Sequence, residues 1–198
     1  FITINVSEFY RNPDQWEILE KSILPDILNK NRKLKIWSAA CSTGDEPYTI
    51  AMILNNYLPL EDINILATDI DIEALNKAKA GIYSSKSLEN LPEKYLKKYF
   101  TAEKNNNNIL YKINDDIKNC VTFKQHNLLR DEYPKQCDLI ICRNVLIYFT
   151  EEAKAQIYKK LNEALKNEGV LFVGSTEQII MANKYNFRSL RTFFYVKN

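Results

Sequence analysis

A single glycine stands in residues 39–48, AACSTGDEPY, which join a predicted buried strand to a predicted helix. Phosphate-binding loops need GxxxxGK(S/T) or GxGxxG, because backbone N–H groups must approach the pyrophosphate closely. Neither pattern is present. The helix instead begins with Asp45 and Glu46, whose charges would repel a phosphate at that N-terminus, although acids there can also serve only the helix dipole. The segment favours a ligand without phosphate.

A second acidic position follows the next predicted strand. Asp69 and Asp71 close the segment INILATDID, residues 63–71, and an acid at this place commonly accepts hydrogen bonds from ribose hydroxyls. A ligand with a ribose, a positive charge and no phosphate satisfies both acidic positions, and S-adenosylmethionine (SAM) is such a ligand. The alternative is an NAD-dependent oxidoreductase, which needs pyrophosphate contacts that the glycine-poor loop does not offer.

A third polar group follows a later apolar run. The segment CRNVLIYF, residues 142–149, places Arg143, Asn144 and Tyr148 after the apolar LIIC, where a sheet edge would meet a ligand cleft. The alternative is a polar strand exit with a tyrosine that only packs and makes one hydrogen bond.

A metal site is not expected. The four cysteines contain no CxxC pair, and His126 is the one histidine, so the ligands for structural zinc are missing. We expect buried free thiols in a reducing compartment, and a structural role for His126.

The elements that must position these residues alternate between short apolar strands and helices. Such alternation predicts an α/β fold with a doubly wound, mostly parallel, Rossmann-like sheet. Residues 82–120 break the rhythm with four asparagines and short alternating segments, which predicts a small antiparallel β insertion. Strands are expected at 33–40, 63–71, 121–129, 137–149 and 169–177, with a last antiparallel strand at 187–198. Helices are expected at 14–29 (kinked or divided at Pro25), 46–58, 72–81, 87–100 and 151–169.

Composition restricts the remaining classes. With 198 residues, of which 45% are hydrophobic, one domain over residues 1–198 is expected. The net charge of +2, from 27 basic and 25 acidic residues, does not produce the overall positive potential that is typical of nucleic-acid-binding proteins. No apolar run approaches the roughly 20 residues of a membrane helix and no signal peptide opens the chain, so a cytoplasmic protein without membrane insertion is expected. Because Phe1 starts in mid-pattern, we expect a fragment.

These segments together resemble the CheR-type chemotaxis receptor methyltransferases, over nearly the whole chain. The matching blocks are NVSEFYR (5–11), WSAACSTGDEPYTIA (37–51), ATDID (67–71), HNLL (126–129), CRNVLIYF (142–149) and GVLFVGSTE (169–177). The resemblance implies transfer of a methyl group from SAM to glutamate side chains of chemotaxis receptors, with S-adenosylhomocysteine as product. It also implies the cytoplasmic domains of methyl-accepting receptors as partners, and we expect a monomer. In some family members the β subdomain tethers a receptor tail peptide.

The resemblance also implies the site residues. The positions that match SAM contacts of the family are Asn5, Ser7, Arg11, Glu46, Asp69, Asn127, Leu128, Arg143 and Asn144. Arg11 and Tyr148 match the residues nearest the transferred methyl group, and are the expected catalytic pair. For Ser7 the alternative is the N-cap of a helix.

Such a transfer needs no general base, because glutamate with a pKa of roughly 4.3 is already ionised at neutral pH. The alternative from another class is a non-catalytic SAM-binding or receptor-docking module.

Overall fold

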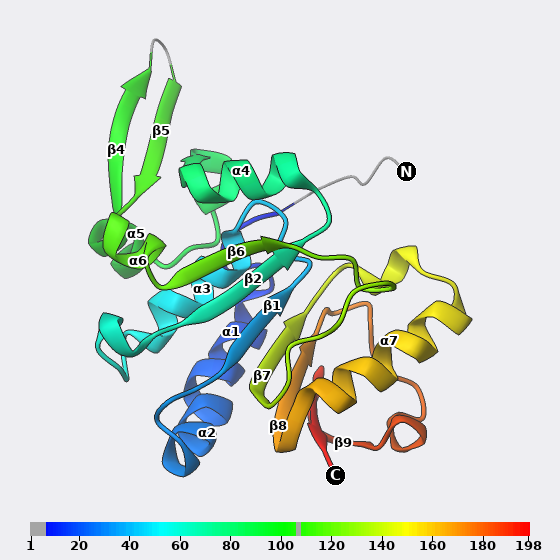
Figure 1. The fold of residues 1–198 in the computed structure, drawn as a ribbon. Helices are drawn as coiled ribbons and strands as arrows, with labels where there is room; N and C mark the ends of the chain where they lie inside the picture. The colour runs from blue at the N-terminus through cyan, green and yellow to red at the C-terminus, as the bar shows by residue number, and fades with distance from the viewer. Residues whose placement is uncertain (1–6, 106–107) are drawn as a thin grey trace.

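The computed structural model describes residues 7–105 and 108–198, and its centre is a seven-stranded sheet (Figure 1). The strand order is β6-β2-β1-β7-β8-β10-β9. β6, β2, β1, β7 and β8 run parallel, and β10 is antiparallel to both β8 and β9. The strands are β1 (Ile36–Ala39), β2 (Ile65–Asp69), β6 (Val121–Gln125), β7 (Cys137–Cys142), β8 (Leu165–Val173), β9 (Phe187–Arg191) and β10 (Phe194–Lys197). The expected α/β, mostly parallel sheet is confirmed.

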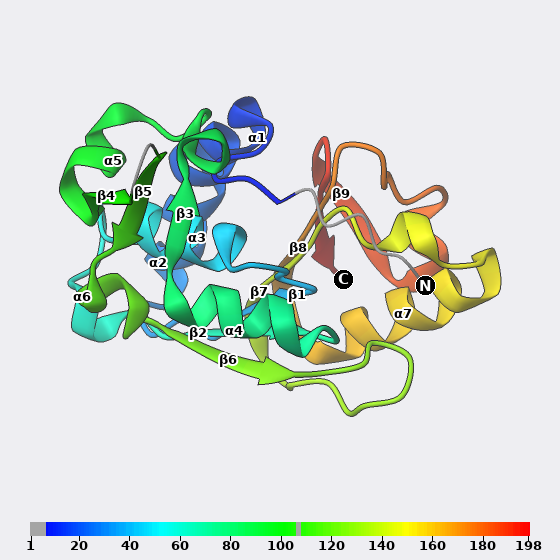
Figure 2. The same cartoon turned by 90° about the horizontal axis from the view of Figure 1, so that it is seen from above.

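Helices cover both faces of this sheet. Figure 2 shows α1, α2 and α3 on one side and α7 on the other. Alternate residues of β7 enter the two cores: Leu139 packs with the α1–α3 side, and Ile140 packs with α7. The helices are α1 (Pro13–Ile18), the π-helical η1 (Leu19–Ile23), α2 (Leu24–Lys30), α3 (Asp45–Leu54), α4 (Ile72–Ala80) and α7 (Glu151–Ala164). Short 3₁₀ turns are η2 (Leu60–Asp62), η4 (Leu146–Tyr148) and η5 (Ala182–Tyr185).

The helix expected at 14–29 is divided, as the proline indicated. The π-helical η1 separates α1 from α2, and Pro25 lies in the first turn of α2. Because α2 continues directly from η1, Pro25 removes one backbone donor from a continuous helix. The Tyr57 hydroxyl donates to the Glu20 carbonyl at 2.6 Å, which compensates for that missing donor.

Two expected boundaries near the C-terminus are wrong. The helix expected to reach residue 169 ends at Ala164, and β8 begins at Leu165 and ends at Val173. Pairing of Leu165 with Cys137 in the parallel ladder prevails over the helix propensity of the polar residues that follow. The segment 187–198 forms two strands instead of one, because Phe193, with φ 67°, turns the chain between β9 and β10.

The expected antiparallel insertion is present as a three-stranded sheet in the order β3-β5-β4. Its elements are β3 (Ile82–Ser84), η3 (Ser85–Leu88), α5 (Glu93–Tyr99), β4 (Phe100–Asn105), β5 (Asn108–Ile113) and α6 (Asp115–Lys118). Figure 1 shows β4 and β5 projecting from the body. The Tyr83 hydroxyl donates to the Thr43 carbonyl at 2.8 Å, so the insertion touches the loop between β1 and α3. Its extent as a subdomain, 82–120, stays a prediction.

No helix among the described residues is long and apolar enough to cross a membrane.

Candidate functional site

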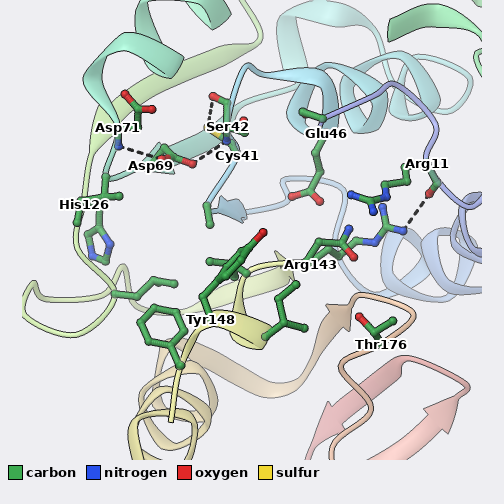
Figure 3. A pocket seen from close by; sticks show the side chains of 18 of the residues that line it. Arg11, Cys41, Ser42, Glu46, Asp69, Asp71, His126, Arg143, Tyr148 and Thr176 are labelled. Carbon is green, nitrogen blue, oxygen red and sulfur yellow. Dashed lines mark hydrogen bonds between the residues drawn. The ribbon is translucent and has the colours of Figure 1, made fainter. Parts of the chain in front are cut away.

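A cavity of about 640 Å³ opens at the carboxyl ends of the parallel strands. Strand order reverses there between β1 and β7, which is where open α/β sheets bind ligands. Figure 3 shows its side chains converging from both sides of that point. The sequence-predicted residues that line it are Ser7, Arg11, Glu46, Asp69, Asn127, Leu128, Arg143, Asn144 and Tyr148. Asn5 lies outside the described residues.

Asp69 ends β2 with its carboxylate fixed by backbone donors. Oδ2 accepts from the Ser42 N–H at 2.7 Å, and Oδ1 accepts from the Asp71 N–H at 2.9 Å. The loop that meets it is tightly wound, with positive φ at Ala40 and Ser42. Gly44 has φ 90°, and a Cβ there would approach the Ala78 Cβ to 2.9 Å. This loop therefore needs only one glycine. Gly44 allows the positive φ and the close approach of Ala78, and it does not serve to bind a phosphate.

The loop after β6 carries Asn127 and Leu128 and closes on itself. The Asn127 N–H donates to the Asp131 carboxylate, and the Asn127 side-chain oxygen accepts from the Leu129 N–H. Lys160 of α7 then donates to the Leu128 carbonyl at 3.1 Å and to the Asp131 carbonyl at 3.0 Å. This loop is held against α7 by a side chain that sequence reasoning did not single out.

His126 is a buried residue that also lines the cavity. Its Nε2 lies 3.1 Å from the Glu132 carbonyl, and because a carbonyl only accepts, Nε2 carries the hydrogen. The ring lies edge-on to Trp37 and to Tyr133, with centroids 5.5 Å away in each case. These contacts support the structural role expected for it.

Glu46 is a half-buried residue whose carboxyl group points into the cavity (Figure 3). Its Oε1 accepts from the Ser38 hydroxyl at 2.7 Å. Burial raises the pKa of Glu46 to about 7; the charge of Arg143 and the Ser38 hydrogen bond oppose this shift, and the charge of Glu177 adds to it. A cation bound beside Glu46 would favour its ionised form.

Asp45 has a different role from its neighbour. It is buried, and its carboxylate accepts from the Ser7 hydroxyl at 2.8 Å and from the Thr43 hydroxyl at 2.5 Å. It is not among the residues that line the cavity. Of the two acids expected to repel phosphate, Glu46 alone faces the ligand space. The N-cap alternative for Ser7 is wrong, because α1 begins after Asn12.

Arg143 connects the N-terminal segment to the sheet. Its Nη2 donates to the Arg11 carbonyl at 2.9 Å, the Asn12 side-chain oxygen at 3.0 Å and the Gln15 side-chain oxygen at 3.1 Å. Its guanidinium carbon lies 4.7 Å from the ring centroid of Phe172. Burial lowers the pKa of Arg143, and Glu46 opposes this. Arg143 thereby fixes the backbone that presents Arg11 to the cavity.

Tyr148 and Asn144 line the cavity from the segment that follows β7. Tyr148 lies in η4, is 46% exposed and reaches toward the middle of the cavity (Figure 3). The alternative of a buried packing tyrosine is wrong. Asn144 precedes η4 with φ 59°, a left-handed conformation that asparagine tolerates better than most residues.

The donor set fits a cationic adenosine ligand. Asp69 ends β2, where an acid commonly accepts hydrogen bonds from ribose hydroxyls, and Glu46 supplies a second carboxyl group to the cavity. Ser42 Oγ, His126 Nδ1 and Arg143 Nε are buried without a hydrogen-bond partner in the described part of the chain. Such atoms on a cavity wall are available to a ligand. No cluster of metal-ligating side chains occurs within residues 7–105 and 108–198.

Comparisons with known proteins agree with this chemistry. Residues 5–195 match the family described as CheR methyltransferase, SAM binding domain. A chemotaxis protein methyltransferase of Listeria monocytogenes is 45% identical over 197 residues, covering 99% of this chain and 74% of the relative. Another, of Borreliella burgdorferi, is 39% identical over 209 residues, covering 100% and 72%. A solved TehB-like SAM-dependent methyltransferase from Corynebacterium glutamicum shares the fold, with TM-score 0.50 and 15% identity over 93% of both chains.

Lys160→Met should weaken SAM binding about tenfold, or roughly 1.4 kcal/mol, because the carbonyls of the loop after β6 lose their shared donor. Isothermal titration calorimetry measures the dissociation constant. Lys159→Met is the matched control, since Lys159 is an exposed neighbour on the same helix. Equal affinities of the Lys160 variant and the wild type would contradict the role given to this contact.

The pKa of Glu46, about 7, predicts SAM binding that strengthens as pH rises from about 6 to 8, since the ionised carboxylate attracts the cation. Glu46→Gln should bind more weakly and lose this pH dependence. Calorimetry at several pH values measures the SAM affinity of both proteins. Any pH dependence that remains in Glu46→Gln comes from titration of groups other than Glu46, including those of SAM itself.

In the ligand-free protein, Glu46 should make the free energy of unfolding fall as pH rises, whereas it makes SAM affinity increase. A raised carboxyl pKa favours folding below about pH 4.5, and this contribution is lost as pH rises through about 7. The decline in unfolding free energy over that window should be smaller in Glu46→Gln. An identical decline in both proteins would show that Glu46 does not titrate there.

Proposed function

The chain belongs to the CheR methyltransferase family, and from this premise we propose that it methylates glutamate side chains of chemotaxis receptors and releases S-adenosylhomocysteine. Family membership makes it a SAM-dependent methyltransferase of chemotaxis. The receptor, the glutamate acceptor, the monomeric state and the cytoplasmic location belong to the proposal.

The observation that carries the proposal is a cavity with the carboxyl group of Glu46 on its wall, available to a cation, and without a hydrogen-bonded nucleophile–histidine pair among the residues that the structure describes. The bound SAM supplies an electrophilic methyl group on a sulfonium. A glutamate acceptor with a pKa of roughly 4.3 arrives already ionised, so the chain has no proton to remove. Its task is alignment, and well-oriented groups reach effective molarities of about 10⁵–10⁸ M.

Three groups would hold the cofactor. Asp69 retains lone pairs beyond its two backbone bonds and would accept from the ribose hydroxyls. Glu46 would oppose the charge of the methionine portion. Asn127 and Leu128, on the loop closed by Lys160, would flank the adenine.

Two groups would act at the methyl end. Arg11 is presented to the cavity by the Arg143 clamp, and its planar fork would orient the acceptor carboxylate through paired hydrogen bonds. Tyr148, on the opposite wall, would narrow the approach to the transferred methyl group and exclude water.

Asp69→Ala should abolish measurable SAM binding by calorimetry and methyl transfer with it, because the ribose loses its acceptor. Transfer is measured with methyl-labelled SAM and receptor-containing membranes, as base-labile methyl esters. Asp62→Ala is the control, since Asp62 is exposed and distant from the cavity lining. Wild-type protein that binds SAM without forming esters would instead indicate a non-catalytic SAM-binding module.

Arg11→Ala should keep SAM affinity within about threefold but reduce methyl transfer by about 10²-fold or more, because misplacing the acceptor costs about this much. Arg11→Lys should restore only part of the rate, since an ammonium lacks the planar fork. Arg188→Ala, at an exposed arginine of β9, serves as control. Normal turnover by Arg11→Ala would exclude the orienting role.

A further inference from the structure

Glu177 is a buried acid whose block, GVLFVGSTE, had no assigned role in the sequence. It is 5% exposed and lies in the loop that follows β8. Its neighbours Ser175 and Thr176 line the cavity, whereas Glu177 itself does not. The side chain therefore acts on the site through other residues.

Its carboxylate accepts three backbone hydrogen bonds. Oε2 accepts from the Asn144 N–H at 2.5 Å and from the Gly174 N–H at 3.0 Å, and Oε1 accepts from the Leu146 N–H at 2.6 Å. Charge-assisted bonds of this kind are short and strong. One buried side chain thus satisfies backbone donors from two loops that are distant in sequence.

The two loops follow neighbouring strands, because β7 pairs in parallel with β8. Glu177 joins them across the carboxyl edge of the sheet. The approach is close enough to require glycine at 174: a Cβ there would lie 2.5 Å from Glu177 Oε2 and 2.7 Å from Asn144 Oδ1. The sequence GSTE supplies both the carboxylate and the space that it needs.

The bonded amides bracket the start of η4. Asn144 lines the cavity directly, and Leu146 is the first residue of the turn that carries Tyr148. Because Tyr148 is only half buried, core packing alone does not fix its orientation. The position of its backbone depends on the turn whose first amide Glu177 binds.

We propose that Glu177 is a positioning residue that fixes the Asn144–Tyr148 segment at the methyl end of the cavity. It does not touch the cofactor or the acceptor. The expected effect of Glu177 on the rate of methyl transfer rests on the proposed function. The expected effect of Glu177 on the backbone of residues 144–148 does not depend on which acceptor is methylated. Asn144 is itself an expected SAM contact, but Asp69, Glu46 and the loop after β6 hold the cofactor from elsewhere on the cavity wall, so SAM affinity is affected less than turnover.

Glu177→Gln tests this, because the amide keeps the size of the side chain but places an N–H₂ group among three N–H donors. In ligand-free protein, hydrogen exchange of peptides covering 143–148 and 174–177 should accelerate while the remainder of the sheet stays protected. With labelled SAM and receptor membranes, kcat should fall about tenfold or more while the KM for SAM stays within about threefold. Glu61→Gln, at an exposed acid of η2 outside the cavity lining, should match the wild type in both measurements.

Unchanged exchange in the two peptides would overturn the inference, as would a loss of SAM affinity equal to the loss of rate. If the wild type forms no esters, the proposed function fails, while the exchange data still decide whether Glu177 holds the segment. Should Glu177→Gln not fold, Glu177→Asp carries the same expectation with smaller changes, because it retains the charge on a shorter arm.

Discussion

The site depends on four carboxyl groups at the carboxyl edge of a parallel sheet, each held by hydrogen-bond donors. Asp45 and Glu177 are buried, and Asp69 and Glu46 are half-buried. Asp69 and Glu177 accept from backbone N–H groups, and Asp45 and Glu46 accept from hydroxyl groups. Burial of a charge is costly unless hydrogen bonds compensate for it. Asp69 and Glu177 therefore organise the loops whose N–H groups donate to them. Glu46 has one hydroxyl donor, so a bound cation would stabilise its ionised form more than that of the others.

The segments around the cavity are coupled by a few polar contacts. Arg143 connects β7 to the N-terminal segment through three acceptors, and Tyr83 connects the β insertion to the loop before α3. Both side chains are buried and end on backbone or side-chain oxygens, so neither can move without losing hydrogen bonds. Hydrogen bonds thus connect segments around the cavity that come from distant parts of the chain.

Several features could be predicted from the sequence because they are local. Alternating apolar runs indicated the parallel sheet, the four asparagines and the short alternating segments around them indicated the β insertion, and Gly81 ends α4 in the left-handed conformation. The end of α7 was misplaced because strand pairing at Leu165, a contact with Cys137, decided it. The family blocks contain residues that line one cavity, but Asp45 was expected on the ligand side, and no motif indicated Lys160.

The sequence by itself determined which residue types stand at the ends of the strands, and hence that the ligand is phosphate-free and cationic. Residue type and position are sufficient for that, since alternation of strands with helices predicts parallel strands, whose carboxyl ends lie at the same edge of the sheet. Only the tertiary structure decided that Glu46 faces the cavity while Asp45 turns to Ser7 and Thr43, and that Glu177 anchors η4. These outcomes depend on which donors from distant segments meet each carboxylate, and sequence spacing does not encode those meetings.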